Sequence, residues 1–73
     1  MPLTTIQVHR GNAPAQGVTV MLSFLTGGVS ATERTGRDGT ATISHSATGN
    51  AKVIIDGRTM GTIRTPGRES FRI

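Results

Sequence analysis

The residues of this chain that could carry out chemistry are few and widely separated. His9 and His45 are the two histidines, and each lies at or near the end of a predicted strand. A transition-metal site would need further nitrogen, sulfur or carboxylate ligands close to them. The spacing offers no such carboxylate, and the chain has no cysteine. We therefore expect both histidines to be surface residues, with no metal ion and no cofactor bound.

The carboxylates and hydroxyls do not form a recognisable catalytic set either. The four carboxylates are Glu33, Asp38, Asp56 and Glu69. The two Asp residues lie in predicted turns, where the side chain caps its own backbone, and each Glu is next to an Arg. A catalytic carboxylate needs burial or a like-charged neighbour to shift its pKa, and no nucleophile elbow or phosphate-binding glycine loop is present. The sequence predicts a protein that is not an enzyme.

Arg side chains dominate the charge of the chain. The formal net charge is +4, and seven of the eight cationic residues are Arg. Four of them fall in the last 16 residues: Arg58, Arg64, Arg68 and Arg72. Guanidinium groups bind phosphates and carboxylates, so these four are candidate anion-binding residues.

Two interpretations of this charge stay open. The arginines could form a solvated rim that protects edge strands from pairing. Alternatively, the protein is a small basic β-barrel that binds nucleic acid or another polyanion, although such surfaces usually stack bases on aromatic rings. Phe24 and Phe71 are the only aromatic residues of this kind in the chain.

The segments that must position these residues alternate between polar and apolar side chains. Val18, Val20, Leu22 and Phe24 show this period of two most clearly. The period is typical of β-strands, and no helical period is present. Gly-rich turns separate seven predicted strands, near residues 3–9, 17–25, 29–35, 39–45, 50–56, 58–64 and 69–73. Many short strands with such turns predict a single all-β domain over residues 1–73, either a sandwich or a small β-barrel.

Two Asp-Gly dipeptides predict tight reversals of the chain. Asp56-Gly57 separates two alternating segments by two residues, which is the strongest hairpin signal in the sequence. Asp38-Gly39 precedes the alternating stretch TATIS, and we expect it to form a second hairpin between 29–35 and 39–45. Both dipeptides tolerate the positive φ angles that a type I′ turn requires.

Two predicted strands carry apolar residues on both faces. Met21 and Leu25 alternate with the core positions of 17–25, and Ile54 does so in 50–56. A small sandwich has no third layer to cover these side chains, so we expect Met21, Leu25 and Ile54 to form a subunit interface. A chain of 73 residues without disulfides also gains from such burial. The predicted partner is a second copy or a larger protein assembly.

Three stretches combine turn glycines with segments in which polar and apolar residues alternate. In IQVHRGNAPAQGVTVML (6–22), Gly11, Pro14 and Gly17 lie between two alternating segments. In TGRDGTATI (35–43), Thr35, Gly39, Ala41 and Ile43 follow, and TGNAKVIIDGRTMGTI (48–63) is the third. Together they resemble transthyretin-like and carboxypeptidase-regulatory-like domains, and bacterial Ig-like domains share a similar pattern. One departure is Ala51, where the family usually has an aromatic residue.

The resemblance implies a seven-stranded antiparallel Greek-key sandwich. Such domains mostly serve as spacers, accessory modules or binding surfaces, so it implies a non-catalytic structural or protein-interaction module. The hydroxyisourate hydrolase branch of the family ends in Tyr-Arg-Gly-Ser, whereas this chain has no Tyr and ends in ESFRI. That activity is not expected here.

The sequence also predicts no insertion into a membrane. No segment approaches the roughly 20 apolar residues of a membrane helix. The first ten residues lack a basic segment followed by an apolar one, so they do not resemble a signal peptide. We expect a cytoplasmic location for the chain as written, and a secreted or surface location if a leader has been removed.

Overall fold

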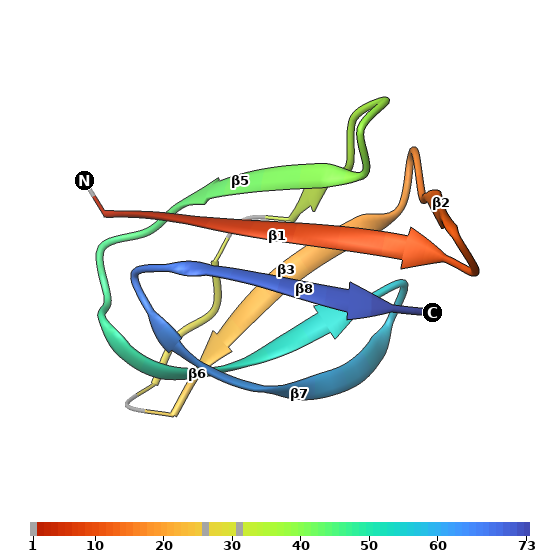
Figure 1. Cartoon of the computed structure of the whole chain (residues 1–73). Coiled ribbons are helices and arrows are strands. Elements are labelled where there is room, and N and C mark those ends of the chain that lie inside the picture. The colour runs from red at the N-terminus through yellow and green to blue at the C-terminus, as the bar shows by residue number, and fades with distance from the viewer. Residues whose placement is uncertain (1, 26, 31) are drawn as a thin grey trace.

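The computed structural model describes residues 2–25, 27–30 and 32–73, which form two β-sheets packed face to face (Figure 1). The strands are β1 (Leu3–Arg10), β2 (Ala13–Pro14), β3 (Thr19–Phe24), β4 (Glu33–Arg34), β5 (Thr40–Ser44), β6 (Gly49–Ile55), β7 (Arg58–Thr65) and β8 (Arg68–Arg72). The described residues contain no helix.

Each sheet has four strands. In the first sheet β1 pairs with β2, β5 and β8, and it lies between β5 and β8 (Figure 1). In the second sheet the order is β4-β3-β6-β7. The chain crosses between the two sheets more than once. For example, β7 and β8 are consecutive in sequence but belong to different sheets.

The predicted all-β sandwich is confirmed, with two separate sheets rather than a closed barrel. The strands number eight and not seven, because the short β2 adds a hairpin to the end of β1. The pairing of β1 with β8 is parallel, whereas every other strand pairing is antiparallel. The predicted strand 29–35 is reduced to β4 and an isolated bridge from Val29 to Ser23. Ala31 of that strand, and Thr26 between the predicted strands 17–25 and 29–35, lie outside the described residues.

The core lies between the sheets and is made by the alternation that the sequence shows. Inward side chains of β1, β3, β5 and β6 are almost fully buried, including Ile6, Leu22, Ile43 and Ile55. Each buried side chain of this size contributes about 1.5–3 kcal/mol. Phe24 is the one Phe in the buried core, while Phe71 packs half-buried against it. β-branched aliphatic residues supply most of the remaining apolar contact.

The two Asp-Gly turns behave differently. Asp56 and Gly57 have φ angles of 53° and 81° and join β6 to β7, with Ile55 opposite Arg58, so this predicted hairpin is confirmed. The predicted hairpin at Asp38-Gly39 is wrong, because β4 pairs with β3 in one sheet and β5 pairs with β1 in the other. A compact turn, closed by bonds from Gly36 N to Thr40 O and Gly39 N to Gly36 O, carries the chain across the sandwich instead.

Candidate functional site

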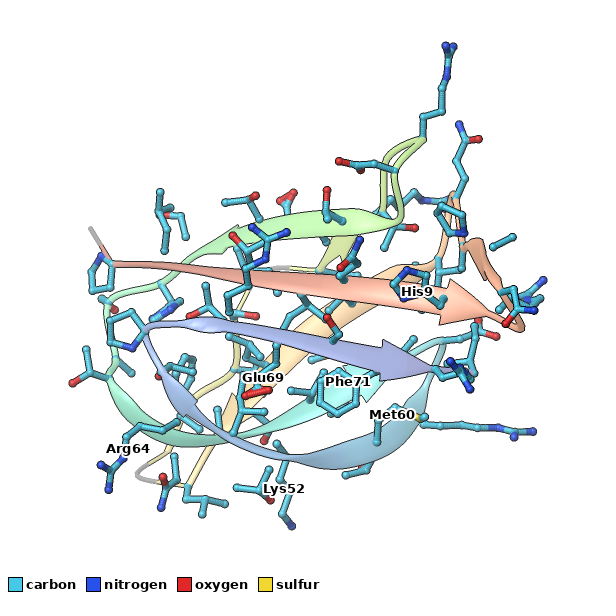
Figure 2. The ribbon with its side chains drawn as sticks, viewed as in Figure 1. His9, Lys52, Met60, Arg64, Glu69 and Phe71 are labelled. Carbon is cyan, nitrogen blue, oxygen red and sulfur yellow. The ribbon has the colours of Figure 1, made fainter. Side chains whose placement is uncertain are left out.

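The four candidate anion-binding arginines do not gather at one place. Arg68 and Arg72 project from the solvent face of β8 in the first sheet, because they share the face of Thr5 and His9 and not that of the buried Ile6. Arg64 lies on the outer face of the second sheet, between the buried Ile63 and Thr65 (Figure 2). Arg58 begins β7 at the hairpin end of the sandwich, where it lines a pocket with Arg10 and Ile73. Only Arg68 and Arg72 therefore lie on the same face of one strand.

Arg68 and Arg72 belong to a continuous polar surface that we call the β8 strip. It consists of Arg68, Ser70 and Arg72 on β8 and their neighbours Thr5, Gln7 and His9 on β1. The Ser70 hydroxyl donates to Gln7 Oε1 at 3.4 Å. The outward residues of the described strands β1, β5 and β8 include no carboxylate. The β8 strip is therefore cationic, with the carboxylate of Asp38 near enough to Arg68 for the two charges to interact.

The three predicted interface residues lie on the opposite side of the molecule. Met21 on β3 is directly opposite Ile54 on β6, and both side chains are half-buried on the face away from the core. Leu25 follows on the same side with 56% of its surface exposed. The structure adds Val29, 63% exposed, whose bridge to Ser23 places it beside this group.

We call Met21, Leu25, Val29 and Ile54 the outer apolar patch. Val29 was not among the predicted interface residues, because the pattern of the predicted strand 29–35 does not assign its side chain to a face. The patch is mixed rather than continuous, because Ser23 and Lys52 form the cross-strand pair after Met21 and Ile54. Lys52 points away from the core (Figure 2).

The predicted surface position of His45 is wrong, because its side chain is only 4% exposed. Its Nδ1 is 2.6 Å from the carbonyl oxygen of Ala47. Since a carbonyl only accepts, Nδ1 carries the proton, and Nε2 accepts from the Thr4 hydroxyl at 2.6 Å. The ring also packs at 5.1 Å from that of Phe24. The period of two could have indicated this burial, since His45 continues the inward positions of Ala41 and Ile43. His9 is half-exposed on β1.

The Thr4–His45 pair has the connectivity of a nucleophile and its base, since a hydroxyl bonds one ring nitrogen and an acceptor orients the other. Thr4, however, has no exposed surface. A cavity of about 280 Å³ is lined by Phe24, Val29 and His45 among others, but not by Thr4. No substrate atom can reach the Thr4 hydroxyl, so we interpret the pair as a buried structural contact.

The carboxylate of Asp38 caps the turn before β5. Its Oδ1 accepts from the Thr40 hydroxyl at 2.6 Å and from the Thr40 N–H at 3.1 Å. These bonds hold the pKa of Asp38 below its ordinary value of 3.8, and the charge of Arg68 acts in the same direction. A general acid needs the opposite shift, so the structure agrees with a turn-capping role.

The lowered pKa of Asp38 predicts a dependence of stability on acid. Since the folded-state pKa is below the unfolded one, the stabilisation by the charged carboxylate is present above about pH 4 and lost as the pH falls through the folded value. We expect the melting temperature of the wild type to exceed that of Asp38→Asn at pH 6, with the difference shrinking below pH 3.8. Thermal unfolding across this range measures it, and a difference that does not change with pH would contradict the assignment.

No group of three or more metal-ligating side chains occurs within residues 2–25, 27–30 and 32–73. In the same described part of the chain, no helix is long and apolar enough to cross a bilayer. The chain matches no family model, no curated protein and no solved structure.

Proposed function

We propose that the protein is a non-catalytic structural or protein-interaction module that associates with a second copy, or with a larger assembly, through the outer apolar patch. The observation that supports this most is the direct pairing of Met21 with Ile54 on the two central strands of the second sheet. These side chains lie on the face away from the core and are not covered by a third layer.

The composition of this face suits an interface between folded partners. Such interfaces combine a small apolar centre with a polar rim, and their bulk hydrophobicity is close to that of the remaining surface. Leu25 and Val29 add exposed apolar surface, while Lys52 and Arg64 supply the polar surroundings. The transthyretin-like or Ig-like kinship is part of the same proposal, since those domains serve as accessory and binding modules.

A charge placed in the patch should separate the copies. We expect the wild type to show a mass above that of the monomer in size-exclusion chromatography with light scattering, and Met21→Asp and Ile54→Asp to be monomeric. Leu25→Asp tests the same surface at a more exposed position, with less effect on folding. Each introduced carboxylate would be buried without a partner on association, which costs several kcal/mol.

The matched control is Thr42→Asp, which adds the same charge at an exposed position of β5 on the other sheet. It should leave the mass unchanged. A wild type that stays monomeric at all concentrations, or variants with the wild-type mass, would reject self-association through this patch.

The alternative function, binding of nucleic acid or another polyanion through the C-terminal arginines, stays a prediction with less support. Arg64 lies on the outer face of the other sheet, and Arg58 lines a pocket with Arg10 and Ile73 beyond the end of β8, so the four candidate arginines do not form one site. A fluorescent oligonucleotide at about 50 mM salt, where phosphate contacts are strongest, tests this alternative.

A further inference from the structure

We propose that the free edge of β8 binds an extended acidic peptide, which pairs with this strand and extends the first sheet. The surface is separate from the outer apolar patch, so the inference does not depend on self-association. Figure 1 shows β8 at the border of its sheet, next to β1 and to no other strand of that sheet.

The backbone of β8 has one side satisfied and one side open. Thr5 N donates to Gly67 O, and Ile73 N donates to His9 O. In a parallel ladder these two bonds place the backbone groups of Glu69 and Phe71 toward β1 and those of Arg68, Ser70 and Arg72 away from it. The backbone groups of Arg68, Ser70 and Arg72 make no backbone hydrogen bond within the described residues. Three N–H groups and three C=O groups therefore face outward.

The charges beside this edge oppose pairing with a second copy of β8. Arg68 and Arg72 lie on the same solvent face, with Ser70 between them. An antiparallel copy centred on Ser70 would set Arg68 against Arg72 of its partner, and a parallel copy would stack each Arg on itself. Like charges directly opposite each other destabilise a sheet, whereas opposite charges contribute. A strand with acidic residues on its solvent side is the complementary occupant.

The inner side of the edge offers an apolar contact as well. Phe71 is half-buried and packs against the core together with Met60 (Figure 2). Its ring lies against Gly61 of β7, where an added Cβ would meet Phe71 Cε1 at 3.4 Å. A peptide strand on β8 would place alternate side chains next to Phe71 and Glu69. The expected pattern is thus acidic residues on one side and small or apolar residues on the other.

The other long edge is less suited to this role. On β7, the edge strand of the second sheet, a register shift opposite Val53 and Ile54 twists the strand. It breaks the regular spacing of the backbone N–H and C=O groups on the free edge. At the start of β5, the backbone groups of Thr40 are already used, because its carbonyl oxygen accepts from Gly36 N and its N–H donates to Asp38 Oδ1. The β8 edge combines regular pairing, unoccupied backbone groups and two arginines on its solvent face, of which Arg68 also interacts with the charge of Asp38.

Ser70→Pro is the decisive variant. Its N–H points away from β1, so proline removes an outward donor without removing a bond of the β1–β8 ladder, and proline is tolerated in edge strands at such positions. Ser70→Ala is the matched control because it loses the same hydroxyl and keeps the N–H. The Arg68→Gln/Arg72→Gln double variant removes both charges and keeps the backbone.

The probe is a fluorescent seven-residue peptide in which Glu alternates with Val or Thr, with blocked ends, titrated at about 50 mM salt. We expect binding to wild type and Ser70→Ala within about twofold of each other, and at least about tenfold weaker binding to Ser70→Pro. The double Arg variant should lose about two- to thirtyfold. Hydrogen exchange should show the amides of Arg68, Ser70 and Arg72 becoming protected when the peptide binds.

Three outcomes would overturn the proposal. The peptide does not bind the wild type; or Ser70→Pro, shown to be folded by circular dichroism, binds as well as Ser70→Ala; or the three outward amides gain no protection in the wild type. The last measurement decides the matter even if Ser70→Pro does not fold. An oligonucleotide that binds more tightly than the peptide and is indifferent to Ser70→Pro would assign the arginines to a polyanion instead.

Discussion

Replacing Gly39 with Ala should lower the free energy of unfolding by about 2–5 kcal/mol, the sum of a backbone and a packing cost. Gly39 has a φ of 78°, where an L side chain costs about 1–2 kcal/mol. A Cβ at this position would lie 2.5 Å from Val8 O and 3.0 Å from Pro14 Cβ. Val8 N also donates to Gly39 O at 2.7 Å, so the turn cannot move away without breaking the start of the β1–β5 ladder. Urea unfolding followed by circular dichroism measures the loss.

Gly57→Ala is the matched control for this prediction. Gly57 has nearly the same φ, 81°, but an added Cβ there meets nothing within 4 Å. We expect it to lose only the backbone cost of about 1–2 kcal/mol. A domain of this size is stable by roughly 4–11 kcal/mol, so the Gly39 variant loses a large part of the total and the Gly57 variant does not. Equal losses in the two variants would show that the contact with Val8 is not decisive.

Thr4→Val should lower the free energy of unfolding by about 1–3 kcal/mol, because it leaves a buried acceptor without its donor. Val has nearly the shape of Thr, so the packing around Ile43 is retained while His45 Nε2 loses its hydrogen bond. For a domain of this size each kcal/mol corresponds to about 4–8 °C in melting temperature. Thermal unfolding at pH 7.5 therefore gives a shift that is easily resolved.

Thr42→Val provides the comparison on the solvent face of β5, where Thr42 is exposed. That substitution should change the free energy of unfolding by less than about 0.5 kcal/mol. Nitrogen chemical shifts of His45 test the assigned tautomer directly, since Nδ1 must carry the proton to donate to Ala47 O. Protonation of Nε2 alone, or equal effects of the two Thr variants, would contradict this arrangement.

The two stability predictions concern positions whose importance the sequence does not reveal. Thr4 is one of many hydroxyl residues in the chain, and Gly39 is one of ten glycines. Thr4 matters because the loop after β5 brings His45 back to it from 41 positions away. Gly39 matters because β1 and the segment after β2 converge on it. In both cases the deciding contact is made by residues distant in the sequence.

Alternation by itself determined which side chains face the core. It placed Ile6, Leu22 and Ile43 inside and Met21 and Ile54 on the outer face, because successive side chains of a strand point to opposite sides. It also identified the Asp56-Gly57 hairpin, since a two-residue loop with two positive φ angles fixes the pairing of the strands beside it. Both features depend only on residues that are close together in the sequence, so short segments are enough to predict them.

Only the tertiary structure decided which strands become neighbours. Asp38-Gly39 carries the same turn signal as Asp56-Gly57, yet it leads to a different sheet, because a turn reverses the chain without selecting its next partner. The C-terminal arginines separate for the same reason, since β7 and β8 join opposite sheets. The open edge of β8 and its parallel pairing with β1 depend on residues more than 60 positions apart. Such long-range pairing is chosen by the burial of the whole core, and no short stretch of this sequence encodes it.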